Sequence, residues 1–198
     1  MNLPNKLTVS RAIATPLFMA VMLIEAIPFN YTAALIIFVL ASLTDYFDGK
    51  IARSRGIITN FGKSLDPVAD KMLTTAAMLG FMIIMPERAY AIQIAAITFL
   101  TLFREYVVFS VRLISATSEK KKVIAANIWG KLKTVSQMFC IILGLAAYSV
   151  RDFIPGGGAW FSGMLIAFIV TAWISAVFTV VSGVIYFLES KELIDFSE

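Results

Sequence analysis

Four aspartates lie close together in the first half of the chain. Asp45 and Asp48 are three residues apart, and Asp66 and Asp70 are four residues apart. At these spacings on a helix, the members of each pair lie on one face. Both pairs stand at the polar ends of apolar segments, so the sequence predicts two acidic helix faces that can meet.

Four carboxylates beside a membrane are unfavourable unless their charge is neutralised, and two divalent cations would balance it. The chain has no histidine, and its one cysteine, Cys140, lies within an apolar segment. Ligation by carboxylate oxygens alone suits hard ions such as Mg²⁺ or Mn²⁺ and argues against a structural zinc site. The pattern therefore predicts a centre of two magnesium or manganese ions.

Such a pair of ions suits substitution at phosphorus, because it neutralises phosphate oxygens and aligns the attacking group. Gly49 follows Asp45 by one turn, and Gly62 precedes Asp66 by one turn. Without side chains at these glycines, a bulky substrate can approach the helix backbones. Arg53 offers a fork of donors to a phosphate. These residues indicate a substrate that contains phosphate.

Two other interpretations are open for the acidic pairs. They could be helix caps or ion-pair partners of cations on a solvated face, namely Lys50, Arg53, Lys63 and Lys71. Four carboxylates within a membrane could also form the passage site of a metal-ion transporter. Neither alternative explains why glycines flank both pairs at one turn's distance.

Together these residues resemble the signature of the CDP-alcohol phosphotransferase family. Every position of that signature is filled, by Asp45, Asp48, Gly49, Ala52, Arg53, Gly62, Asp66 and Asp70. The resemblance implies a six-helix membrane fold, commonly a homodimer, that binds two metal ions, takes a CDP-linked lipid as donor and releases CMP.

The resemblance also implies a role for each residue of the signature. Asp45, Asp48 and Asp66 would ligate metal, and Asp70 would ligate metal and accept the proton of the attacking hydroxyl. The remaining positions would line the CDP site: Gly49, Ala52, Arg53 and Gly62. Thr8 and Arg11 would either contact donor phosphates or cap and anchor the first helix.

The second half of the chain bears on the acceptor. Four cations lie at the predicted charged ends of the fourth and fifth helices: Arg104, Arg112, Lys131 and Lys133. If they face the aspartates, they favour an anionic acceptor such as glycerol 3-phosphate over a neutral polyol. Alternatively, each could be a positively charged anchor at the membrane interface. Glu105 would either orient this site by pairing with Arg104 or Lys131, or form a simple surface ion pair.

Three local patterns resemble the bacterial phosphatidylglycerophosphate synthases within that family. They are Asn5-x2-Thr8-x2-Arg11, Arg104-Glu105-x6-Arg112, and the stretch from Ala125 to Thr134. This resemblance implies transfer of the phosphatidyl group of CDP-diacylglycerol to glycerol 3-phosphate. Other acceptors known for the family, namely inositol phosphate, serine or phosphatidylglycerol, stay open as alternatives.

The composition predicts the elements that must position these groups. Hydrophobic residues make up 59% of the chain, charged residues 15%, and the mean hydropathy is +0.84, which is typical of a membrane protein. Six apolar segments predict an all-α fold with six transmembrane helices: Val9–Ile27, Tyr31–Leu43, Met72–Met85, Ala89–Phe103, Val123–Val150 and Trp160–Leu188. Polar helical extensions are expected over Thr44–Arg55, Gly62–Lys71 and Arg104–Ser115.

The positions of lysine and arginine predict the orientation. All of them except Arg88 and Arg151 fall in the terminal segments, in two charged connections and at the adjoining helix ends. The positive-inside rule therefore places both termini and the active site on the cytoplasmic side of the cell membrane. The net charge of +4 fits an anionic lipid surface and gives no reason to expect nucleic acid. We expect one membrane domain over residues 1–198.

Overall fold

A computed structural model describes residues 3–55, 60–117, 128–154 and 158–190, and of residues 3–8, 45–55, 60–70, 112, 114–117 and 190 it describes the backbone only. All regular elements in these ranges are α-helices, which confirms the prediction of an all-α fold. They are α1 (Leu3–Leu23), α2 (Asn30–Arg55), α3 (Asn60–Ile84), α4 (Arg88–Thr117), α5 (Ile128–Phe153) and α6 (Gly158–Ser190).

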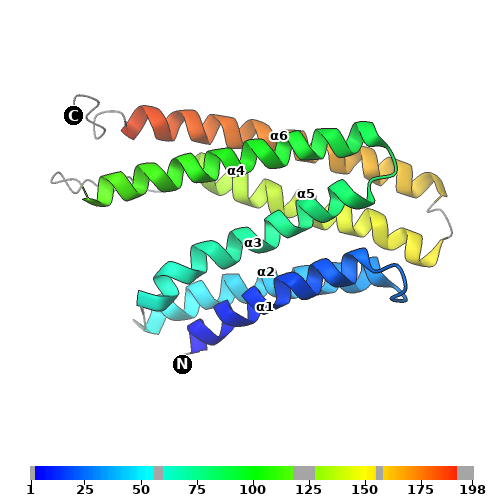
Figure 1. Ribbon diagram of the computed structural model, residues 1–198, viewed down its shortest axis with the longest axis horizontal. Coiled ribbons are helices and arrows are strands. Elements are labelled where there is room, and N and C mark those ends of the chain that lie inside the picture. Colours follow the sequence, from blue (N-terminus) through cyan, green and yellow to red (C-terminus); the bar gives the residue numbers. More distant parts are fainter. Residues whose placement is uncertain (1–2, 56–59, 118–127, 155–157, 191–198) are drawn as a thin grey trace.

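Successive helices run in opposite directions, so the chain has two distinct ends (Figure 1). We call one the charged end; it holds the start of α1, the end of α2, the start of α3, the end of α4, the start of α5 and the end of α6. The opposite end, the turn end, holds the short connections before α2, α4 and α6. The helix ends that adjoin the predicted charged connections thus lie opposite the turn end.

Helix α5 lies at the centre of the bundle and packs against α6, α2 and α3. Helix α1 packs against α2 and α3, and α6 also contacts α4. The rings of Phe81 and Phe168, from α3 and α6, meet at 4.6 Å between centroids beside Gly144 of α5, where an added Cβ would come within 2.7 Å of Phe81. The core therefore requires a glycine at that crossing.

At the turn end, a carboxylate joins α5 to the first turn of α2. Asp152 Oδ2 accepts hydrogen bonds from the backbone N–H of Thr32, at 2.7 Å, and from its hydroxyl, at 2.6 Å. A carboxylate at a helix N-terminus satisfies a free donor and interacts favourably with the helix dipole. This contact fixes the two helices relative to each other far from the charged end.

Large apolar side chains are exposed around the bundle, among them Ile13, Phe99, Val135 and Trp160, as expected where hydrocarbon rather than water surrounds a protein. Among the described residues, three helices are long and apolar enough to cross a membrane: Arg88–Val111, Ile128–Phe153 and Gly158–Glu189. The other three have apolar parts of 10–17 residues: Val9–Leu23, Asn30–Thr44 and Lys71–Ile84.

Candidate active site at the charged end

Both acidic pairs lie on helices at the charged end. Asp45 and Asp48 are in the last turns of α2, and Asp66 and Asp70 are in the first turns of α3. Only residues 56–59 separate the two helices, so the two acidic segments are close along the chain. The side chains of residues 45–55 and 60–70 lie outside the described part, as does that of Thr8. Metal ligation and the roles of Gly49, Ala52, Arg53 and Gly62 therefore stay predictions.

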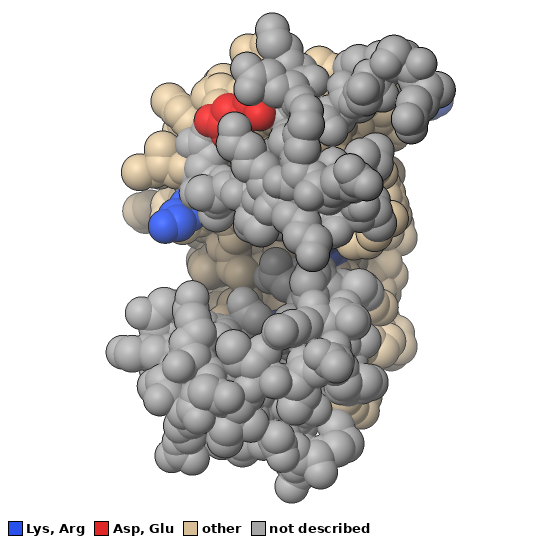
Figure 2. All heavy atoms as spheres, turned by 90° about the vertical axis from the view of Figure 1, so that its left-hand side faces the viewer, with Lys and Arg blue, Asp and Glu red and all other residues tan. Residues whose placement is uncertain are grey.

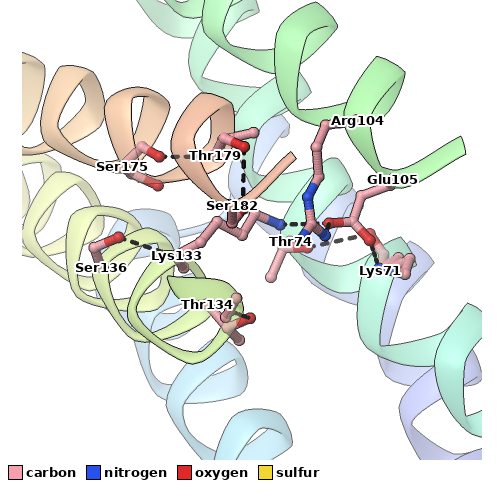
Figure 3. Close-up of polar contacts among 11 residues, drawn as sticks. Lys71, Thr74, Arg104, Glu105, Lys133, Thr134, Ser136, Ser175, Thr179 and Ser182 are labelled. Atoms are coloured by element: carbon pink, nitrogen blue, oxygen red, sulfur yellow. Dashed lines mark hydrogen bonds and ion pairs between the residues drawn. The ribbon is translucent and has the colours of Figure 1, made fainter. Parts of the chain in front are cut away.

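Next to the acidic segment, three cations converge on one carboxylate (Figure 3). Glu105 Oε1 accepts hydrogen bonds from Lys133 Nζ at 2.9 Å and from Arg104 Nη1 at 3.0 Å, and Glu105 Oε2 pairs with Lys71 Nζ. Lys71 comes from α3, Arg104 and Glu105 from α4, and Lys133 from α5. We call these four residues the Glu105 cluster.

Most of this cluster is shielded from solvent. The exposed fractions of the side chains are 8% for Lys133, 12% for Glu105 and 15% for Arg104, whereas that of Lys71 is 44%. Buried charges are costly unless they are paired. One carboxylate neutralises one of three cations, so the four side chains together carry a formal charge of +2. Such a cluster favours a dianionic ligand such as a phosphate monoester.

Lys71 links the cluster to the acidic helix face, because it directly follows Asp70 in α3. Consecutive helical residues differ by about 1.5 Å along the axis and about 100° around it. The cation that pairs with Glu105 is therefore next in sequence to the last signature aspartate. The cluster and the predicted metal centre therefore share α3, at consecutive positions about 100° apart around its axis.

A small polar cavity adjoins the cluster between α3, α4 and α5. Its volume is about 20 Å³, enough for about one water molecule. Polar side chains dominate its lining: Lys71, Thr74, Thr75, Thr98, Thr101, Glu105, Lys133 and Gln137. Seen from the charged end, the surface is hollowed near its middle, and described residues, in tan, are visible inside the hollow (Figure 2). The cluster thus borders a small cavity whose lining also includes Met78 and Leu102.

The structure brings together some of the predicted acceptor residues. Arg104 and Lys133 both contact Glu105, whereas Lys131 is exposed. Two positions along a helix correspond to a rotation of about 200°, which places Lys131 and Lys133 on different faces of α5. The side chain of Arg112 lies outside the described part. For both Lys131 and Arg112, acceptor binding stays a prediction.

Sequence reasoning left the role of Glu105 open and did not include Lys71 in the acceptor site. The contacts favour the first interpretation of Glu105, because its partners come from three helices and its side chain is largely buried. The position of Lys71 directly after Asp70 was the signal for its role. We interpreted Lys71 only as a potential ion-pair partner of the aspartates. Arg11 is buried near the charged end of α1, and both interpretations of its role stay predictions.

Comparison with known proteins agrees with this arrangement. The model of the CDP-alcohol phosphatidyltransferase family matches residues 1–181. Similar curated proteins include three named CDP-diacylglycerol–glycerol-3-phosphate 3-phosphatidyltransferase. The protein of Bacillus subtilis is 36% identical, with 96% of each chain covered, and that of Rickettsia bellii is 35% identical with the same coverage. The protein of Haemophilus influenzae is 34% identical over 96% of this chain and 94% of its own.

The family match covers both signature helices, the Glu105 cluster and most of α6. The matches to these relatives cover nearly the whole chain, so the similarity is not confined to the signature residues. The predicted family is therefore confirmed: this chain is a member of the CDP-alcohol phosphatidyltransferase family.

Proposed function

We propose that this protein transfers the phosphatidyl group of CDP-diacylglycerol to glycerol 3-phosphate, giving phosphatidylglycerophosphate and CMP. The Glu105 cluster carries this assignment, since three cations and one carboxylate lie beside the acidic end of α3. A phosphate monoester gains charge-assisted hydrogen bonds from these cations, whereas an acceptor without net charge, such as serine or inositol, gains less from them. The names of the relatives point to the same acceptor.

In the proposed reaction, the four aspartates hold two divalent ions through carboxylate oxygens, a donor set that fits Mg²⁺ or Mn²⁺. Bound there, the ions would neutralise phosphate oxygens and stabilise the departing CMP. Asp70 accepts the proton of the acceptor hydroxyl as its oxygen attacks the phosphorus that carries diacylglycerol. The bond from this phosphorus to the CMP oxygen breaks, and the electron pair leaves with CMP.

The rest of the site binds the two substrates. Gly49, Ala52, Arg53, Gly62 and Thr8 are the proposed contacts of the CDP group. For the acceptor, Arg104 and Lys133 would bind the phosphate of glycerol 3-phosphate, and Lys71 joins them through Glu105. Lys71 and Asp70 are consecutive on α3, so the proposed acceptor site and the proposed proton acceptor adjoin the same turn of that helix.

The proposed setting is the cell membrane, with six spans, both termini in the cytoplasm and the charged end on the cytoplasmic side. The acyl chains of the donor then stay in the bilayer while its headgroup reaches the site. The exposed apolar side chains around the bundle support this setting. A homodimer is proposed from the family resemblance alone.

The decisive experiment is an assay of CMP release by the purified protein in detergent. CDP-diacylglycerol and Mg²⁺ or Mn²⁺ are supplied with glycerol 3-phosphate, inositol phosphate, phosphatidylglycerol, serine or glycerol, and EDTA and Asp66→Ala serve as controls. We expect metal-dependent release with glycerol 3-phosphate alone. Release with another acceptor would overturn the assignment of the cluster. A lack of release with every acceptor, together with metal flux into sealed vesicles, would support the transporter alternative.

Cysteine labelling tests the orientation. Cys140 is buried, so a Cys140→Ser background allows single cysteines at exposed positions, Glu25→Cys at the turn end and Lys131→Cys at the charged end. In intact cells we expect an impermeant maleimide to label the cysteine at position 25 only. Labelling at position 131 before permeabilisation would contradict the cytoplasmic placement.

A further inference from the structure

Arg104 passes close to glycines of two other helices. A Cβ added to Gly183 of α6 would lie 3.1 Å from Arg104 Cγ, and one added to Gly130 of α5 would lie 3.7 Å from Arg104 Nη2. The second distance is an ordinary van der Waals contact. The first is tighter than most side-chain contacts in proteins, so an alanine at position 183 would require the arginine to move.

The face of α6 near Gly183 is built for close approach. Ser182 and Thr179 are buried there. Their hydroxyls donate to carbonyls of the same helix, Ser182 Oγ to Thr179 O at 3.0 Å and Thr179 Oγ1 to Ser175 O at 2.8 Å. Small side chains with internally satisfied hydroxyls let neighbouring helices come near within a membrane. Helix α4 packs on α6, and the stem of Arg104 lies at Gly183.

We propose that Gly183 is a positioning residue for the acceptor site: its lack of a side chain lets the stem of Arg104 lie against α6, which sets the guanidinium beside Glu105. This inference rests on the proposed role of Arg104 in binding the acceptor phosphate. It adds α6, on which sequence analysis placed no functional residue, to the elements that shape this site.

The position of the contact along the arginine side chain decides its effect. Cγ is the second side-chain carbon, so a displacement there moves every atom that follows, including Nη1. That atom donates to Glu105 Oε1 at 3.0 Å, and the strength of a charge-assisted hydrogen bond depends steeply on distance and angle. A contact at the far end of the side chain is relieved by rotation about one terminal bond, whereas one at Cγ requires the stem of Arg104 to shift by a few tenths of an ångström.

Substitutions at two glycines of α6 test this proposal. In Gly183→Ala we expect the KM for glycerol 3-phosphate to rise about three- to tenfold, as for partial loss of a charged hydrogen bond, and in Gly183→Val to rise further. The KM for CDP-diacylglycerol and the thermal midpoint should not change in Gly183→Ala. Gly163→Ala is the matched control, because an added Cβ there meets nothing within 4 Å.

A double-mutant cycle separates positioning of Arg104 from a general packing effect. Arg104→Ala removes the Cγ that a side chain at position 183 would meet. If Gly183 acts through Arg104, Gly183→Ala raises the acceptor KM in the wild-type background and leaves it unchanged in the Arg104→Ala background. An equal rise in both backgrounds would overturn the inference.

The same measurements distinguish failure of the inference from failure of the proposed function. If Arg104→Ala leaves the KM for glycerol 3-phosphate unchanged, the assignment of the acceptor site is wrong, and the inference falls with it. If Arg104→Ala raises that KM but both substitutions of Gly183 leave it unchanged, only the inference is overturned. A lower thermal midpoint in Gly183→Ala without a change in acceptor KM would likewise reduce Gly183 to a packing residue.

Discussion

The Nζ of Lys133 lies 2.9 Å from Oε1 of Glu105, joining residues 28 positions apart on α5 and α4. Both side chains are largely buried, with exposed fractions of 8% and 12%. Removing one partner of a buried ion pair strongly destabilises the folded protein, because the other charge is left buried. This pair therefore links the geometry of the proposed acceptor site to the stability of the bundle.

Replacing Glu105 with glutamine should weaken both stability and acceptor binding. A neutral amide removes the negative charge that pairs with Lys71, Arg104 and Lys133, and breaking a buried pair costs on the order of 3 kcal/mol. We expect a lower thermal midpoint in detergent and a higher KM for glycerol 3-phosphate. Glu25→Gln, exposed in the turn before α2, is the control, and a Glu105→Gln protein with wild-type stability and KM would contradict this account.

Two lysines of α5 should differ in their effects. Lys133→Met removes a cation held by Glu105, so we expect a rise of roughly tenfold or more in the KM for glycerol 3-phosphate, as for loss of one hydrogen bond to a charged group. Lys131→Met, at an exposed position, should have a smaller effect. If steady-state assays give an equal rise in this KM for both variants, the acceptor also contacts the face of α5 that carries Lys131.

Asp70→Asn tests the proposed proton acceptor. An amide cannot take up the proton of the attacking hydroxyl, and general base catalysis typically contributes about 10²- to 10⁴-fold in rate. We expect kcat to fall within that range while the thermal midpoint stays close to that of the wild type. Glu87→Gln at the exposed turn end controls for loss of a remote carboxylate. Near-normal turnover of Asp70→Asn would remove this residue from the chemistry.

Gly144→Ala tests the central crossing of α3, α5 and α6. The added Cβ would lie 2.7 Å from Phe81 Cζ and 2.8 Å from two carbons of the Phe168 ring, and overpacking of this kind costs about 1–3 kcal/mol. We expect a lower thermal midpoint than for Gly163→Ala, whose Cβ would be in open space. If the two variants unfold at the same temperature, the rings move aside without cost.

The sequence was sufficient to predict the helices, because apolar runs and proline- or glycine-containing turns are local signals. All six predicted segments overlap helices of the structure. The predicted segment Val123–Val150 begins before Ile128, where the described part of α5 starts. The family could also be predicted, since its signature lies within two neighbouring segments.

Contacts between helices could not be predicted in this way. Periodicity gives the faces of one helix, but the rotation and crossing of two helices depend on packing across the whole bundle. For this reason Arg104 and Lys133 were proposed together with Lys131, although only the first two meet at Glu105. For the same reason neither Lys71 nor Gly183 was connected with the acceptor site.

The direct succession of Asp70 and Lys71 in α3 has a consequence for inhibition. If the donor is held at the metal centre to which Asp70 contributes, and the acceptor phosphate at the cluster to which Lys71 contributes, the two substrates meet beside the same turn of α3. A bisubstrate analogue, in which a cytidine diphosphate is joined to a glycerol phosphate through a linker of a few atoms, would then span both subsites at once. Its gain in affinity would come from effective concentration. That gain would disappear in a variant that lacks either the donor subsite or the acceptor subsite.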